Sequence, residues 1–236
     1  MTAAKKRVAA CRPAKDGPSL LGVANAKSII KAVIGPLNRP VAQSRLALAV
    51  KSPSPLKIEI GSHAARRPGW ICTDISWRAR HYLDATKRWP VRTASASHVY
   101  ADNMIEHIRL MPNRRMFREA HRVLVPGGRI RLSTPDVEHV VRLYTADDQE
   151  TRLEMERWRR KGYEIHHPID LLRTTFQDCG HHIGYLWDFA TLTAELESAG
   201  FKSVRRCAPG QSDDPDLRNL EVRPDFALTV EAEATG

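Results

Sequence analysis

Short apolar runs separated by turn residues fill residues 56–136 of the chain. Residues 56–61 (LKIEIG) alternate polar and apolar side chains before a glycine, and residues 69–75 (GWICTDI) form a second short run. A glycine at the end of a strand marks a point where the backbone turns or approaches another group closely. Further apolar runs follow at residues 98–108 and 129–132. The pattern predicts an α/β fold whose strands are mostly parallel.

The second half of the chain predicts several helices and two closing strands. Apolar residues recur at helical spacing, and Asp188 stands where an N-cap would be, with Gly200 just past the helix end. Residues 162–186 form an irregular, histidine-rich stretch. The expected helices cover residues 107–123, 137–144, 147–161 and 189–199, and the expected closing strands cover residues 201–207 and 225–232.

Acidic residues stand near the ends of the expected strands. In open α/β sheets, ligands lie outside the carboxyl ends of the strands. Asp74, near the end of the second run, can accept hydrogen bonds from both hydroxyls of a ribose, and Asp84 can accept one from an adenine amino group. Taken singly, each residue has a plainer interpretation: Gly61 as a turn glycine, Asp74 as a helix N-cap and Asp84 as a turn cap.

Taken in order, these segments resemble a class I S-adenosylmethionine (SAM)-dependent methyltransferase. The resemblance runs through KIEIG, RRPGWICTDI, YLDAT, YADNMIEHI and FREAHRVLVPGGRIRLSTPD to GHHIGYLWDFATLTAELESAGF. From about residue 56 onward, the chain is similar to the bacterial type 11 methyltransferases. The resemblance implies a Rossmann-like sheet, mostly parallel with an antiparallel closing strand, in a three-layer sandwich. It also implies SAM as the cofactor and methyl transfer as the reaction.

The resemblance assigns residues to the SAM site by their place in the family's motifs. Glu59 and Gly61 match the first-loop acid and glycine, and Asp74 matches the ribose acid. Asp84 matches the adenine-loop acid, and Asn103 falls where the family lines the methyl-donor pocket.

One position departs from the family. The first loop usually has a second glycine two positions after the first, and this chain has His63 there. Histidine tolerates a positive φ better than most residues, but it adds a bulky ring. Either the ring turns away and the site binds SAM, or binding is weakened or lost. In the second case the chain is a non-catalytic binding or scaffold module with a methyltransferase fold.

Methyl transfer to a hydroxyl acceptor would require a general base. A hydroxyl acceptor must lose its proton, and a neutral histidine suits that task. His107 and His181 are the candidates, with Asp136 as a third. Each also has a structural interpretation, as a helix or loop residue. The family's association with cell-surface assembly suggests a sugar, glycan or lipid-linked acceptor, bound by loops between residues 144 and 186.

The net charge of +10 looks like a nucleic-acid signature until it is located along the chain. Residues 1–50 hold nine Lys or Arg and one acid, whereas the remaining 28 basic and 26 acidic residues nearly cancel. We therefore expect a basic extension (residues 1–50) and a methyltransferase domain (residues 51–236). Residues 20–34 predict an amphipathic helix that either covers the domain's own edge or rests on an anionic membrane surface.

Other classes fit the sequence less well. A nucleic-acid-binding protein could use the basic N-terminus. However, the domain has no basic stripe with interleaved aromatic residues, apart from residues 158–161. A nicotinamide-dependent oxidoreductase needs a G-x-G-x-x-G loop, which residues 61–66 lack. The four cysteines and ten histidines show no standard ligand spacing, so we expect no metal site and a reduced, cytoplasmic location. No apolar run is long enough to span a bilayer.

Overall fold

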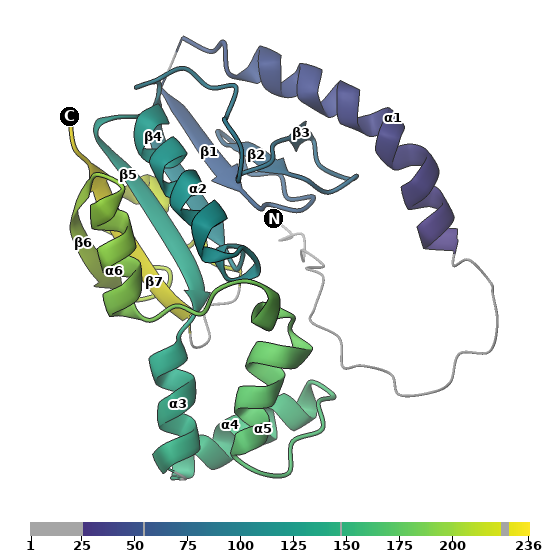
Figure 1. Cartoon of the computed structure of the whole chain (residues 1–236), viewed down its shortest axis with the longest axis vertical. Coiled ribbons are helices and arrows are strands. Elements are labelled where there is room, and N and C mark those ends of the chain that lie inside the picture. The colour runs from purple at the N-terminus through teal and green to yellow at the C-terminus, as the bar shows by residue number, and fades with distance from the viewer. Residues whose placement is uncertain (1–25, 54, 147, 223–226) are drawn as a thin grey trace, which may run out of the picture.

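The computed structural model describes residues 26–53, 55–146, 148–222 and 227–236, without the side chains of residues 26–36 and 182. The strands are β1 (Leu56–Ile60), β2 (Ile71–Asp74), β3 (His81–Tyr82), β4 (Ala96–Asp102), β5 (Leu124–Pro135), β6 (Phe201–Cys207) and β7 (Ala227–Ala234). They form one sheet in the order β3-β2-β1-β4-β5-β7-β6. Among the described strands, β7 alone runs opposite to the other six, and it lies between β5 and β6. The expected sheet is confirmed (Figure 1).

Helices cover one face of this sheet. They are α2 (Leu110–Val123) and α6 (Phe189–Ser198), which pack side by side. Phe117 of α2 and Leu192 of α6 are completely buried against strand residues such as Val99 and Ile130. Asp188 caps α6 by accepting a hydrogen bond from the Thr191 amide at 2.7 Å, as its position in the sequence predicts.

The opposite face of the sheet is polar and is covered differently. It carries Lys57, Glu59, His98, Tyr100, Arg129, Arg131, Glu231 and Glu233, which alternate with the apolar residues of the same strands. A cover segment, residues 208–222, lies over it, and its Leu217 and Leu220 pack on Tyr100. Among the described residues no helix stands between β1 and β4, so loops replace the helical layer expected on this face.

The amphipathic helix of the N-terminal extension reaches further along the chain than predicted. Helix α1 spans Ala26–Ala49, and residues 20–25 of the expected helix lie outside the described residues. Its C-terminal half packs on the edge strand β3, where Asn38 donates to the Trp77 carbonyl at 2.8 Å. Ala42 and Leu46 are fully buried there. This half of the helix therefore covers an edge of the sheet.

A helical insert follows β5 and was predicted only in part. It contains α3 (Val137–Ala146), α4 (Gln149–Arg160) and α5 (Ile169–Arg173), which runs into a π-helical turn (Thr174–Asp178). The insert lies beyond the carboxyl end of β5 and has its own small core (Figure 1). Residues 162–186 are thus more regular than expected. None of the helices in the described part of the chain combines the length and apolar character needed to cross a bilayer.

Candidate active site

The loops after β1 and β4 pack tightly at the carboxyl edge of the sheet. Gly61 ends β1 with a φ of +70°, and a Cβ placed on it would lie 2.3 Å from Cγ of Met104. Both the backbone conformation and the contact therefore require glycine. The close approach expected at Gly61 is confirmed, and the group that approaches is a side chain from the β4 loop.

Asp74 joins the loops that follow β1 and β2. Its Oδ2 accepts from the His63 amide at 2.7 Å, and its Oδ1 accepts from the Ser76 amide at 2.6 Å. A carboxylate offers about four lone-pair sites, so each oxygen keeps one acceptor position. Asp74 is only half-buried, which leaves it accessible to a ligand. It can therefore order these loops and still accept ribose hydroxyls.

His63 keeps the backbone conformation that a glycine would have at this position. Its φ is +54°, and its side chain is exposed rather than folded into the loop. The ring thus turns away from the loop, which is the conformation that the SAM-binding course requires. A left-handed backbone costs a non-glycine residue about 1–2 kcal/mol, less for histidine than for most.

We expect His63→Gly to raise the free energy of unfolding by up to about 1 kcal/mol, because it removes this backbone cost while keeping the amide that Asp74 binds. Urea denaturation followed by circular dichroism measures the change. The matched control is Ala64→Gly, an exposed neighbour whose φ is not positive. It should lose stability through the greater freedom of the unfolded chain. A loss in both variants would show that position 63 carries no strain.

Glu59 and Asp84 make other contacts. Glu59 is buried on the polar face, where its Oε2 lies 3.2 Å from both Arg67 Nε and Cys72 Sγ. It braces the loop that carries Gly61 and His63. Burial would raise the pKa of Asp84, but hydrogen bonds from Thr86 and the nearby Lys87 ammonium hold it below its usual value.

Asp84 also lines a pocket between α1 and the β3 loop. The pocket has a volume of about 330 Å³. Its lining residues are Arg39, Gln43, Leu46, Ala47, Tyr82, Leu83, Asp84, Lys87, Arg88 and Pro90.

Asn103 turns the chain after β4. Its φ is +49°, and its side-chain amide donates to Oδ1 of Asp102 at 2.8 Å. Asp102 Oδ2 accepts from the Val222 amide of the cover segment at 2.8 Å, and burial raises the pKa of this carboxyl. Sequence reasoning missed Asp102, although an acid that ends a strand at the ligand edge is a usable signal.

The two candidate histidines come together. His107 ends the 3-10 turn Ile105–His107, and His181 begins the 3-10 turn His181–Ile183. Their ring centroids lie 4.9 Å apart in an edge-to-face arrangement. Nε2 of each ring lies 3.9 Å from Oε1 of Glu106, whose Oε2 accepts from Thr134 Oγ1 at 3.0 Å. Glu106 and His181 are buried, whereas the His107 side chain is 47% exposed.

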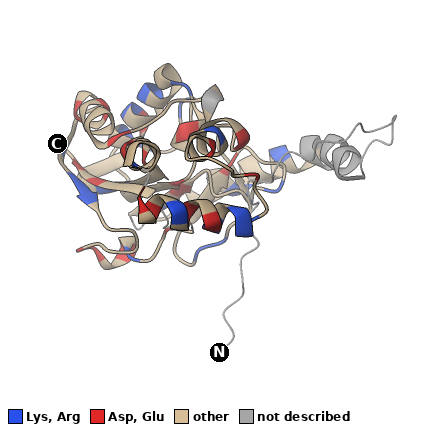
Figure 2. Cartoon of the chain, turned by 90° about the horizontal axis from the view of Figure 1, so that it is seen from below, with Lys and Arg blue, Asp and Glu red and all other residues tan. Residues whose placement is uncertain are grey.

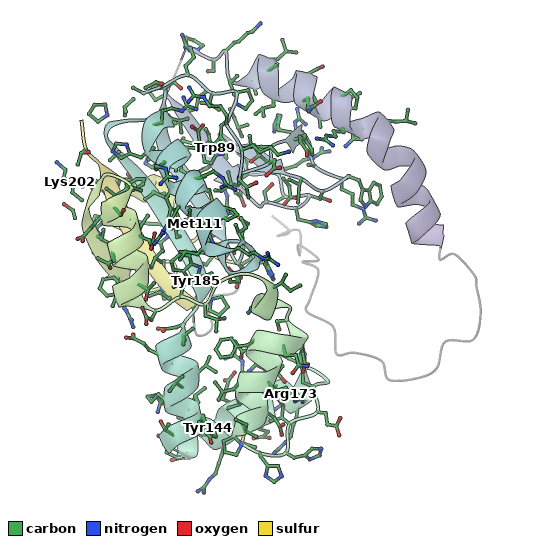
Figure 3. All side chains as sticks on the ribbon, viewed as in Figure 1. Trp89, Met111, Tyr144, Arg173, Tyr185 and Lys202 are labelled. Atoms are coloured by element: carbon green, nitrogen blue, oxygen red, sulfur yellow. The ribbon has the colours of Figure 1, made fainter. Side chains whose placement is uncertain are left out.

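Backbone contacts hold these two segments against each other. The Tyr185 amide donates to the Glu106 carbonyl at 3.2 Å, and a Cβ on Gly184 would lie 1.9 Å from that carbonyl oxygen. Tyr185 lies where the sheet body meets the helical insert (Figure 3). Glu106 was not among the predicted site residues, although it directly precedes His107. The acidic residue directly before a candidate histidine is the sequence signal that could have identified Glu106.

Asp136 lies at the end of β5 but serves another contact. It is buried, its Oδ1 accepts from the Glu138 amide at 3.0 Å, and its Oδ2 lies 3.3 Å from Nη1 of Arg206. These contacts fix the start of α3 and tie it to β6. The contacts described for Asp136 thus place it with α3 and β6 rather than with the histidine pair.

The strand order can now be set beside known proteins. Parallel strands in the order 3-2-1-4-5, closed by an antiparallel strand inserted before the last, are the sheet of the class I SAM-dependent methyltransferases. The fold is of that class. No protein-family model matches the chain, and no curated protein matches it either. The narrower type 11 resemblance stays a prediction.

Solved structures give matches at low sequence identity. A SAM-dependent methyltransferase from Thermotoga maritima, described as a possible histamine N-methyltransferase, matches with a TM-score of 0.48 and 14% identity over 88% of this chain and 98% of its own. The CurJ carbon methyltransferase matches with 0.46 and 13%, over 90% of this chain and 59% of its own. A putative O-methyltransferase from Nostoc punctiforme matches with 0.44 and 14%, over 86% and 58%. At these TM-scores the assignment of the fold rests on the strand order alone.

Proposed function

We propose that this protein transfers a methyl group from SAM to a hydroxyl of a sugar, glycan or lipid-linked acceptor. The observation that carries the proposal is the convergence of the loops after β1, β2 and β4 at one edge of the sheet. There the Asp74 carboxylate is anchored between two of the loops, and Gly61 packs beneath the third. Ligands of open α/β sheets bind at this edge.

The residues present fit the cofactor. The backbone at Gly61, the remaining acceptor positions of Asp74, the turn at Asp84 and the amide of Asn103 would hold it, and Glu59 would brace the first loop through Arg67. Bound SAM would supply a methyl group that is already activated. The protein's own task is therefore to align the acceptor and to remove its proton.

In this proposal the histidine pair removes that proton. A neutral imidazole accepts the proton of a hydroxyl, and the carboxylate of Glu106, 3.9 Å from Nε2 of each ring, favours the charged imidazole that results. His107 is the accessible member and His181 the buried one. We assign Asp136, the third sequence candidate, to positioning α3.

The surroundings of His181 suit an acceptor with an apolar portion. Ile183 is 59% exposed and Leu186 is 41% exposed, and both lie within five residues of His181. Apolar and aromatic side chains beside a few polar groups are typical of small-molecule sites.

The test is transfer of label from [methyl-³H]SAM to separated glycan and lipid extracts. We expect label in one fraction, and a fall in kcat of about 10²–10⁴-fold for His107→Asn or His181→Asn. His166→Asn, which removes an exposed histidine of the insert, should leave the rate unchanged. Binding of S-adenosylhomocysteine without labelling of any fraction would favour the non-catalytic module instead.

The nucleic-acid alternative finds no support in the described residues. Acidic and basic side chains are interspersed over the body of the protein rather than gathered by sign (Figure 2). Many of them pair, as Arg114 does with Glu195 at 2.7 Å and Arg122 with Glu119 at 2.7 Å. Paired surface charges offer little to a phosphate backbone.

A further inference from the structure

We propose that Glu106, His107 and His181 together bind a divalent transition-metal ion, of which Zn²⁺ is the best match. Each offers one ligand atom, and the three atoms lie within 4.8 Å of one another. Two imidazoles and a carboxylate are a ligand set that zinc takes in catalytic sites, where water or substrate fills the open position.

The distances are close to those that a metal requires. Ligand atoms bound to zinc at about 2.0–2.1 Å in tetrahedral geometry lie roughly 3.3 Å apart. Glu106 Oε1 lies 3.9 Å from Nε2 of each histidine. Small side-chain rotations therefore close the set around an ion without moving the backbone, which the contact between Gly184 and the Glu106 carbonyl holds in place.

The surroundings have the features of a functional metal site. Thr134 donates to Oε2 of Glu106 at 3.0 Å, which orients the carboxylate so that Oε1 faces the histidines. Such supporting hydrogen bonds are a regular part of metal sites. Glu106 and His181 are buried, whereas His107 is half exposed, so one side of the cluster is open to an entering ion and to an acceptor.

A second cluster of possible ligands lacks this character. His98, Asp214 and Asp216 also bring their ligand atoms within 4.8 Å. However, Asp214 already pairs with His98 at 2.9 Å, and Asp216 pairs with Lys57 at 2.7 Å. An ammonium group at a carboxylate ligand opposes a cation, so we assign this cluster to holding the cover segment on the sheet.

The metal refines the proposed function, on which its catalytic role rests. In that reaction the acceptor hydroxyl would occupy the open position, and the metal would lower the pKa of the hydroxyl, whose proton passes to water. The oxygen then bonds the methyl carbon as the carbon–sulfur bond breaks. The histidines would then serve as ligands rather than as the base, because the metal-bound hydroxyl would lose its proton to water. Metal binding itself needs neither SAM nor acceptor.

The experiment is titration of the tag-free full chain, stripped with EDTA, with Co²⁺, and then displacement by Zn²⁺. Visible Co²⁺ absorption bands report the ligand set and its geometry. We expect one Co²⁺ per chain, displaced by one Zn²⁺. Thr134→Val should weaken binding by about 10–100-fold, and His181→Ala or Glu106→Ala should weaken it further. His166→Ala, the matched control, should bind as the unmodified protein does.

Two outcomes overturn the proposal: no Co²⁺ band in protein that circular dichroism shows to be folded, or bands that survive in both ligand variants. Titration of the metal-free protein with S-adenosylhomocysteine separates this failure from that of the proposed function. Binding of S-adenosylhomocysteine without binding of Co²⁺ would contradict only the metal site. Binding of Co²⁺ without binding of S-adenosylhomocysteine would support the metal site and contradict the proposed methyltransferase function.

Discussion

Arg131→Met is expected to lower the free energy of unfolding by about 3–5 kcal/mol. Arg131 lies on the polar face of the sheet with no exposed surface, and it binds Glu221 through Nε and Glu231 through Nη1, each at 2.5 Å. Burial would lower the pKa of this guanidinium, but the two carboxylates hold it above its usual value. Removing the arginine leaves the buried Glu221 without its guanidinium partner and leaves Glu231 with only the guanidinium of Arg205, which is the costly way to break such a cluster.

The matched control stands two residues earlier on the same strand and face. Arg129 lies 3.5 Å from Glu233, and the two side chains are 25% and 35% exposed. Arg129→Met should cost less than about 1 kcal/mol, as exposed pairs do. Urea denaturation of both variants measures the difference. Equal losses would mean that the buried ion cluster adds nothing specific to stability.

The difference in the free energy of unfolding between Arg131→Met and the unmodified protein should also become smaller at acidic pH. Burial would raise the pKa of Glu231, but hydrogen bonds from Arg205, Ser212 and Arg131 hold it below its usual value. A carboxyl whose pKa is lowered by folding stabilises the protein above its unfolded pKa, and that stabilisation is lost as the pH falls through the folded pKa. Urea denaturation at pH 7 and at pH 4 tests this. An unchanged or wider gap at pH 4 would contradict it.

Gly184→Ala is expected to have the second largest effect. Its Cβ would lie 1.9 Å from the Glu106 carbonyl oxygen and 2.7 Å from the His107 carbonyl carbon, both backbone atoms that cannot rotate away. The loop must therefore move, at a cost of about 1–3 kcal/mol. The same movement separates His181 from Glu106, so kcat should fall by about 10²-fold.

Gly180→Ala is the control in the same loop. A Cβ there meets nothing within 4 Å, and only its φ of +78° opposes alanine. This variant should lose about 1–2 kcal/mol through the left-handed backbone and keep its activity and metal binding. If Gly184→Ala keeps both as well, the contact between the two loops does not position the cluster.

Local patterns predicted the elements of the fold well where each element carries its own signals. The closing strand at residues 201–207 and the capped helix α6 are confirmed, because turn and cap residues mark their ends. The chain before β4 was harder. Helix α1 passes Pro36 and Pro40, where local rules would end it. In the described residues the connections between β1 and β4 are turns and loops rather than helices, and no local signal in the sequence excluded helices there.

The candidate site was predicted one residue at a time. Gly61, Asp74 and Asn103 do gather at the carboxyl edge, since parallel strands place their ends together. The pairing of His181 with Glu106 could not be predicted, because it joins residues far apart in the chain through the shape of the insert. No local pattern announces such a contact. The ion pairs of the polar face could not be predicted for the same reason, since Arg131 contacts Glu221 and Glu231 only in the folded sheet.

The most direct test of the central claim is calorimetric titration of the full chain with S-adenosylhomocysteine, alongside His63→Gly and Asp74→Ala. We expect saturable binding by the unmodified protein, equal or tighter binding by His63→Gly, and loss of binding in Asp74→Ala. Binding only by His63→Gly would mean that the exposed histidine has disabled a methyltransferase fold. No binding by any folded variant, or full binding by Asp74→Ala, would contradict the assignment of this edge of the sheet as a SAM site.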